Sequence, residues 1–266
     1  MSQGKHLLIC TLGASWAVLP EVLSFLDPVK YPLLSQHPER EVWHRLLKRY
    51  GVQSPDELWI ITTGGTEESL QYFRQWWEQQ NGPLAVKIWS ASNSHDLNTQ
   101  QECENFRELV FRVCLRARDY THNGGSMSMS LAGGRKTMSA DLQQASTIFG
   151  ATALLHVATT GTLPPQLFKP QAQDFCQALP AEEARLVSPI LVGQGTRSLI
   201  LDLQRDEVPP IVAKDYPVAW PLRESRWFET SMPIDTHKLK QEIENRQTES
   251  QQLLDNYINL SASMLS

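Results

Sequence analysis

Cysteine is scarce in this 266-residue chain, and no two cysteines have the spacing of a redox or metal-binding motif. The four are scattered and form no Cys-x-x-Cys pair: Cys10, Cys103, Cys114 and Cys176. Cys10 lies in an apolar run that is typical of a buried strand, and Cys103 and Cys114 lie in a helical stretch. We therefore expect buried free thiols in a reducing compartment, and no disulfide framework.

Long apolar runs and a positive net charge are also missing. No stretch approaches the roughly 18 apolar residues of a membrane span, so we expect no membrane partner. The apolar run at 6–12 is too short for a signal peptide and has no cleavage pattern after it. The formal net charge of −5 argues against a nucleic-acid-coating protein, which is normally basic, and we expect no DNA partner. These absences favour a soluble cytoplasmic protein and are compatible with a small anion in a local basic pocket.

Strand-like and helix-like segments alternate through the first two thirds of the chain. Short apolar runs predict strands at 6–11, 57–62, 85–89, 127–131 and 153–157. Segments with helical spacing of apolar residues lie between them, at 15–26, 39–50, 66–80, 98–118 and 140–149. This alternation is typical of βαβ units, and it predicts an α/β fold with a mainly parallel sheet and helices on both faces.

The pattern changes after Thr162. Prolines become frequent, one strand is expected at 197–203, and a helical stretch with a partial apolar stripe is expected at about 235–260. We predict that residues 1–162 form the α/β domain. Residues 163–266 are predicted to form a small C-terminal appendage of β-structure and helix, which acts as a lid, a dimer clasp or a docking element.

The most informative segment is Ser128–Ser139, where an apolar strand ends at two glycines and a helical pattern follows. Gly133 and Gly134 have no Cβ, so the backbone of this turn can approach a ligand closely. Arg135 and Lys136 place two positive charges beside the N-terminus of the following helix, whose free N–H groups and dipole favour an anion. We interpret the segment as a phosphate-binding turn.

Two other predicted strands end in turns of similar chemistry. Thr11-Leu12-Gly13-Ala14-Ser15 follows the first strand, and Thr62-Thr63-Gly64-Gly65-Thr66 follows the second. The carboxyl ends of parallel strands meet at one edge of the sheet, which is where ligands of such folds bind. Small residues, hydroxyls and one basic pair therefore converge, and three such turns at one edge predict a pocket.

Two familiar nucleotide-binding motifs are absent. A P-loop requires a glycine directly before its lysine and another glycine five residues earlier. Here Arg135 precedes Lys136, and Ser130 stands in the place of the earlier glycine. A dinucleotide-binding turn requires Gly-x-Gly-x-x-Gly after the first strand, and the turn at 11–16 has one glycine. These departures disfavour ordinary nucleoside triphosphatases and dehydrogenases.

The combination resembles the CARF (CRISPR-associated Rossmann fold) family, whose members sense cyclic oligoadenylate, and within it the NE-type CRISPR-associated proteins. The resemblance covers about residues 4–160. It rests on the turn Thr11–Ser15 and on the run Ser130-Leu131-Ala132-Gly133-Gly134-Arg135-Lys136-Thr137-Met138. It implies a Rossmann-like fold, a cyclic oligoadenylate ligand, and a homodimer in which the ligand lies across the twofold axis.

The carboxy-terminal third departs from the best-known relatives, many of which carry a helical nuclease domain with an Arg-x(4–6)-His motif. Arg116 and His122 have this spacing, but they lie near the end of a predicted helix inside the first domain. We interpret that match as chance, because a motif requires its structural context. His237 has no metal-ligand residues nearby. Without a recognisable effector domain, the resemblance implies a stand-alone ring nuclease that destroys its messenger, most readily cyclic tetra-adenylate.

The predicted cleavage requires neither a metal nor a cofactor. A ribose 2′-hydroxyl attacks its own 3′-phosphate when the attacking and leaving oxygens are held in line, and a 2′,3′-cyclic phosphate results. The predicted catalytic residues are Lys136 and Arg135, which stabilise the developing charge, and Ser15, which orients a ribose or phosphate. The predicted ligand-binding residues are Thr11, Gly13, Ala14, Thr63, Gly64, Gly65, Gly133, Gly134, Thr137 and Met138.

Simpler roles stay open for these residues. Arg135 and Lys136 also fit a solvated helix start, Ser15 fits a helix N-cap, and the turn at 62–66 fits a chain reversal that caps the next helix. Two other functions stay open as well. One is a non-catalytic sensor that binds cyclic oligoadenylate and signals through its C-terminal region, and the other is a nucleotide-binding protein unrelated to CRISPR defence.

Several side chains outside these turns are less informative. Asp96, Asn98 and the segment Ser92–Ser94 follow the third strand, so the topology places them on the ligand edge, where they can contact an adenine. His156 lies in an apolar strand and fits a core histidine. Trp76 fits a packing role better than a platform on which a base stacks.

Overall fold

The computed structural model describes residues 4–80, 84–91, 94–121 and 124–193, and residues 241, 245, 248, 251, 252 and 255. It comprises two compact units, Met1–Gly195 and Thr196–Ser266. The six described residues of the second unit are all helical and fall within the helix expected at 235–260. The strand expected at 197–203 lies outside the described residues, as do His122 and His237.

The first unit is built on a six-stranded sheet with the order β3-β2-β1-β4-β5-β6. Its strands are β1 (His6–Leu12), β2 (Glu57–Thr63), β3 (Ala85–Ala91), β4 (Ser126–Ser130), β5 (Ala153–Thr159) and β6 (Val187–Gly193). The first five pair in parallel, and β6 pairs with β5 antiparallel. The predicted α/β fold with a mainly parallel sheet is confirmed.

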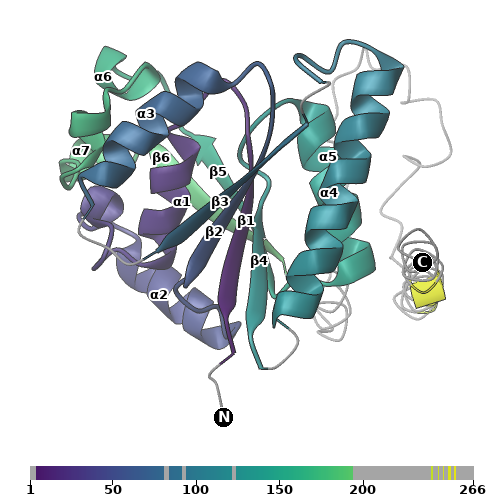
Figure 1. The fold of residues 1–266 in the computed structure, drawn as a ribbon. Coiled ribbons are helices and arrows are strands. Elements are labelled where there is room, and N and C mark those ends of the chain that lie inside the picture. The colour runs from purple at the N-terminus through teal and green to yellow at the C-terminus, as the bar shows by residue number, and fades with distance from the viewer. Residues whose placement is uncertain are drawn as a thin grey trace, which may run out of the picture. The chain divides into compact units, whose positions relative to one another are not determined.

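Helices cover both faces of this sheet, as predicted (Figure 1). They are α1 (Val18–Leu26), α2 (Arg40–Arg49), α3 (Glu67–Glu78), α4 (Gln100–Thr121), α5 (Lys136–Phe149), α6 (Pro165–Phe168) and α7 (Ala181–Ala184), with 3-10 turns at Pro32–Leu34 and Ala172–Phe175. α1, α2 and α3 lie on one face, and α4 and α5 pack together on the other. None of the described helices is both long and apolar enough to cross a membrane.

The central strand β1 explains why both faces are covered. Every residue from Leu7 to Leu12 is buried. Leu8, Cys10 and Leu12 join the core cluster that includes α1, and the alternation of side chains directs Leu7 and Ile9 to the opposite face. A strand buried on both sides is a continuous apolar run in the sequence, which is why β1 could be located in advance.

The sixth strand, β6, was not predicted. It contains Pro189, and a proline inside an apolar run argues against a strand because its nitrogen has no hydrogen to donate. The strand is tolerated here because it lies at the edge of the sheet. Its pairing with β5 makes residues up to 193 part of the sheet, so the first unit extends to Gly195, beyond the boundary expected after Thr162.

Two side chains expected in the core differ in their surroundings. Trp76 is buried, and its indole N–H donates a hydrogen bond of 3.0 Å to the carbonyl oxygen of Phe175, in agreement with a packing role. His156 on β5 is only half-buried, because β5 lies next to the edge strand and its second half is less covered than its first. It is therefore not the enclosed core histidine that the apolar run predicted.

All four cysteines are free thiols. Cys10 and Cys114 are buried, as expected, and burial raises the pKa of both thiols. Cys103 and Cys176 are only half-buried. Cys10 and Cys114 therefore act as small apolar side chains in the packing on either side of the sheet.

Glu21 is an acid inside the apolar helix α1. Its neighbours from Leu19 to Leu26 are buried, and its own exposure is 7%. Burial disfavours the charged carboxylate and raises the pKa of Glu21 from 4.5 to about 7. Between these pH values the folded chain keeps a proton that the unfolded chain releases. The stability of the fold therefore decreases as the pH rises from about 4.5 to 7.

We expect Glu21→Gln to stabilise the protein at pH 8. At this pH the buried carboxyl group either ionises in an apolar site or keeps a proton that it would lose in water, and both cost free energy, whereas an amide is always neutral. The gain in the free energy of unfolding should reach at most about 3 kcal/mol at pH 8 and vanish near pH 4. Urea denaturation at the two pH values measures it. The exposed Glu68→Gln on α3 is the control and should give no comparable gain. An equal effect of Glu21→Gln at both pH values would contradict the assignment.

Candidate functional site

The three predicted turns meet at the carboxyl ends of β1, β2 and β4, where they surround a hollow of about 240 Å³. A fourth segment, the loop after β3, completes its wall. The lining residues are Gly13, Ala14, Thr63, Gly65, Thr66, His95, Asp96, Leu97, Gly134, Arg135 and Met138. The prediction that separate turns converge at one edge thus agrees with the geometry, and the binding roles of the individual residues stay predictions.

Close backbone contact between two of these turns accounts for their glycines. A Cβ on Gly13 would lie 2.5 Å from the Cα of Gly134, and one on Gly133 would lie 2.1 Å from the carbonyl oxygen of Thr11. Gly134 also has a φ of 76°, in the left-handed region that favours glycine. The sequence suggested that these glycines allow a ligand to come close to the backbone. In the structure their missing Cβ atoms allow the two turns to contact each other.

Thr11 and Ser15 have different positions from those predicted. Thr11 is fully buried, and its hydroxyl donates a hydrogen bond of 2.8 Å to the carbonyl oxygen of Gly133, so it joins the two turns. Ser15 is exposed and is not among the residues that line the hollow. It is not the cap of α1 either, because that helix begins at Val18 with Ala17 in the capping position.

The turn after β2 packs against the loop after β3. The Gly64 N–H donates to the carbonyl oxygen of Ser94 at 2.9 Å. A Cβ on Gly64 would lie 3.1 Å from Nδ1 of His95, and one on Gly65 would lie 3.0 Å from the carbonyl oxygen of His95. The two glycines therefore make room for His95, which the sequence analysis did not consider.

Thr66 occupies the capping position of α3, but its side chain does not cap the helix. Its hydroxyl donates instead to the carbonyl oxygen of Thr63 at 2.8 Å. The hydroxyl of Thr62 donates to the carbonyl oxygen of Leu12 at 2.9 Å, which ties this turn to the turn after β1. The threonine hydroxyls of the second turn thus hold the wall of the hollow together.

The basic run lies at the start of α5. Arg135 is half-exposed, and its Nη2 lies 3.3 Å from Oδ1 of Asp96 on the opposite lip of the hollow. Met138 is buried beneath it, and its Sδ accepts a hydrogen bond of 3.2 Å from the Arg135 backbone N–H. Lys136 and Thr137 are exposed and do not line the hollow. Arg135 is thus the cation that faces the hollow directly, with Lys136 beside it on the first turn of α5.

Glu102 holds the loop after β3 in place. Thr99 and Glu102 form a capping box at the start of α4: the Glu102 N–H donates to the Thr99 hydroxyl at 3.2 Å, and the Thr99 N–H donates to Oε2 of Glu102 at 3.2 Å. The same carboxylate accepts N–H groups from His95 at 2.9 Å and Asn98 at 3.0 Å. Leu97 between them has a left-handed φ of 53°, rare for a residue with a Cβ, so the loop depends on this support.

These hydrogen bonds, with that from the His95 N–H contributing most, lower the pKa of Glu102 to about 2. The carboxylate therefore holds the loop at neutral pH and loses this effect as the pH falls from about 4.5 to 2. The Thr-x-x-Glu pattern at 99–102 is the sequence signal that could have revealed this residue, and the sequence analysis missed it.

The side chains of the hollow suit an anionic ligand with polar groups. Arg135 and the N-terminus of α5 favour a phosphate, and Asp96 and the imidazole of His95 can accept hydrogen bonds from hydroxyl or amino groups. Asp96 thus lines the site, as its position after the third strand suggested. Among the described residues, no group of three or more His, Cys, Asp or Glu side chains lies close enough to hold a metal ion.

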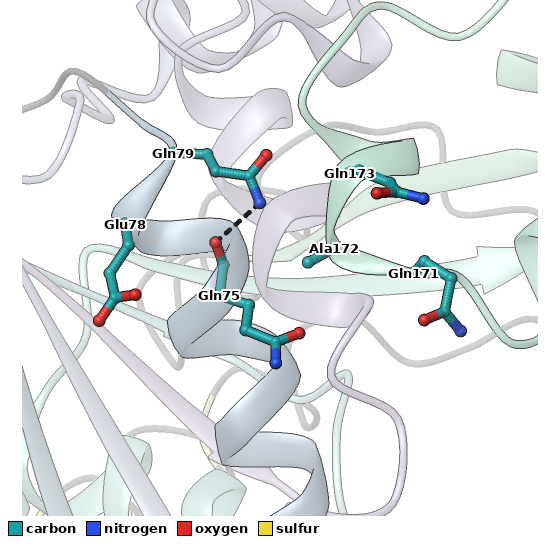
Figure 2. A pocket seen from close by; sticks show the side chains of 6 residues that line it. All are labelled: Gln75, Glu78, Gln79, Gln171, Ala172 and Gln173. Carbon is teal, nitrogen blue, oxygen red and sulfur yellow. Dashed lines mark hydrogen bonds between the residues drawn. The ribbon is translucent and has the colours of Figure 1, made fainter.

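A second hollow, of about 320 Å³, lies between α3 and the segment that precedes Phe175 (Figure 2). Four of its six lining residues are glutamines: Gln75, Glu78, Gln79, Gln171, Ala172 and Gln173. The Gln79 side chain donates back to the Gln75 carbonyl oxygen at 3.0 Å. None of the residues predicted to bind or cleave a ligand lines this hollow.

We expect Glu102→Gln to loosen the loop at 94–99, because an amide oxygen is a weaker acceptor than a carboxylate and the amide NH₂ cannot accept an N–H. Hydrogen exchange should accelerate about tenfold or more at the His95 and Asn98 amides, and mass spectrometry of peptides from this loop measures it. Glu104→Gln is the matched control, since Glu104 is exposed on α4, accepts the Gln100 side chain, and accepts no N–H of this loop within the described residues. Equal exchange in both variants would contradict the role of Glu102.

Comparisons with known proteins add two findings. A comparison with curated protein sequences found no match. Among the solved structures that resemble the chain is Enterococcus italicus Csm6 bound to cyclic hexa-2′-fluoro-hexa-dAMP, with a TM-score of 0.40 and 12% sequence identity. The alignment covers 75% of this chain and 44% of the Csm6 chain, so this chain spans less than half of that protein.

The family model of the CRISPR-associated protein NE0113 matches residues 78–191. This segment contains the strands β3 to β5, most of β6, and two walls of the hollow, namely the loop with His95 and Asp96 and the turn with Gly134 and Arg135. The match includes the Ala-Gly-Gly-Arg-Lys-Thr run on which the predicted resemblance mainly rested. Over these residues the chain is similar to the NE0113 family of CRISPR-associated proteins, and the predicted resemblance to NE-type proteins is confirmed.

Proposed function

We propose that the chain binds cyclic oligoadenylate at the hollow and cleaves it as a ring nuclease in antiviral signalling. The observation that carries the proposal is the position of Arg135. It is the N-cap residue of α5, lines the hollow, and belongs to the segment that matches a CRISPR-associated family. A guanidinium beside a helix N-terminus favours a phosphate, and the adjacent turns offer room for a ribose.

The size of the hollow supports a homodimer. Its volume of about 240 Å³ is below the roughly 300–1,000 Å³ of pockets that enclose drug-sized molecules. A cyclic tetranucleotide is larger than such molecules, so one hollow accommodates one part of the ring. In the proposal two copies of the chain face each other, and the ring lies across their twofold axis.

The proposed reaction is an attack of a ribose 2′-hydroxyl on its own 3′-phosphate. When the ring is held with attacking and leaving oxygens in line, positioning alone lowers the barrier by several kcal/mol. In this reaction Arg135 leaves Asp96 and binds the phosphate. Lys136, the next residue, stabilises the negative charge that develops on that phosphate. The products are linear oligoadenylates with a 2′,3′-cyclic phosphate, and no step requires a metal ion.

A non-catalytic sensor is the second candidate. The positions of Ser15 and Lys136 favour it, since both were predicted to be catalytic and neither lines the hollow. In this alternative the chain binds cyclic oligoadenylate and passes the signal on through its C-terminal region, which follows the first unit.

The deciding experiment is a single-turnover incubation with radiolabelled cyclic tetra-adenylate and cyclic hexa-adenylate in EDTA, beside a binding titration. We expect linear products from cyclic tetra-adenylate. Tight binding with an intact ring would assign the protein to the sensor class. Absence of binding to both rings would refute the proposed ligand.

We expect Lys136→Ala to slow single-turnover cleavage about a hundredfold and to weaken ring binding less than tenfold, because its charge is used mainly on the transition state. Lys48→Ala is the control, since Lys48 is exposed on α2 and does not line the hollow. Equal losses in binding and cleavage would show that Lys136 only holds the ligand.

A further inference from the structure

His95 lies where an acid–base residue could meet the ligand. It lines the same hollow as Arg135 and Met138, although it comes from the loop after β3 and they come from the start of α5. Sequence reasoning placed the catalytic groups on Arg135, Lys136 and Ser15, and it required no histidine. The loop nevertheless brings an imidazole to the hollow.

The backbone of His95 is fixed from two sides. Its N–H donates to Oε1 of Glu102 at 2.9 Å, and the preceding carbonyl oxygen of Ser94 accepts the Gly64 N–H at 2.9 Å. Its ring lies over Gly64, where the absence of a Cβ leaves room for it. The backbone that carries the exposed imidazole is therefore fixed beside the hollow, so little backbone freedom is lost when a ligand meets it.

The other candidates for proton acceptor are already engaged. The Thr66 hydroxyl donates to the Thr63 carbonyl oxygen. Asp96 is paired with Arg135 at 3.3 Å, and a carboxylate is in general a weaker base than an imidazole, also after Arg135 has moved to the phosphate. Of the described titratable residues that line the hollow, His95 alone has no hydrogen bond or ion pair through its side chain within the described part of the chain. Ser15 lies outside the lining.

We propose that His95 is the general base of the ring cleavage, an assignment that rests on the proposed function. The imidazole accepts the proton of the ribose 2′-hydroxyl as the O2′–P bond forms and the P–O5′ bond breaks. The leaving 5′-oxygen takes a proton from water, and the imidazolium later releases its own proton to solvent. No electrons are exchanged, and the product keeps the 2′,3′-cyclic phosphate.

The two charges that face His95 have complementary roles in this step. Arg135 moves from Asp96 to the phosphate, which frees the Asp96 carboxylate. That carboxylate lines the same hollow as His95 and can stabilise the positive charge of the imidazolium. The Arg135–Asp96 ion pair thus becomes a cation on the phosphate and an anion in the hollow that contains the base.

The test compares His95→Gln with the native protein in single-turnover cleavage of cyclic tetra-adenylate and in a binding titration. We expect cleavage to slow at least about a hundredfold, the usual effect of losing a general base, and ring affinity to change less than threefold. His44→Gln is the control, because His44 is exposed on α2 and does not line the hollow. Its cleavage rate should equal that of the native protein.

A second variant separates catalysis from structure. His95→Ala should lose cleavage and regain part of it when free imidazole is added, because a small base can enter the space of the missing ring. Native-like cleavage by His95→Gln, or failure of imidazole to restore His95→Ala while the ring still binds, overturns the assignment but leaves the proposed function standing. An intact ring with the native protein overturns the ring nuclease, and the assignment with it.

Discussion

Contact between the backbones of two turns is the constraint on which the site depends. β1 and β4 are neighbours in the sheet, and the turns after them approach until Gly13 meets Gly134 and Gly133 meets the Thr11 carbonyl oxygen. Any side chain at these glycines would separate the turns and displace the start of α5, because a Cβ has no space there. The position of Arg135, and with it the charge of the hollow, follows from this contact.

The opposite wall of the hollow, the loop after β3, is held by the charged carboxylate of Glu102. Glu102 gathers backbone N–H groups of the loop after β3, and that loop presents His95 and Asp96 to the hollow. The Asp96–Arg135 ion pair then joins the two walls. Because both partners are more than half exposed, water screens the pair, and it can be exchanged for a ligand phosphate at small cost. The hollow therefore combines a wall of closely packed turns, at Gly13 and Gly134, with an ion pair at its rim that a ligand can replace.

The parts of the fold that were predicted are those with strong local signals. The strands β1 and β2 are continuous apolar runs, and the Gly133-Gly134 turn is marked by its composition. β6 was missed because Pro189 interrupts its pattern and only its place at the edge makes the proline tolerable. His95 was missed because its importance arises from packing on Gly64, thirty-one residues away in the chain, and no local pattern records such a contact.

The order of the strands also determines when the hollow can exist. The turn at Gly13 is among the first segments of the chain, and its partner at Gly134 follows only after β2, β3 and α4 have been passed. A nascent chain that ends before β4 therefore lacks the wall that Gly134 and Arg135 form. Contacts this distant in sequence form slowly, because a long loop has to close first. The hollow is thus complete only once β4 pairs with β1 and brings the turn at Gly134 against the turn at Gly13.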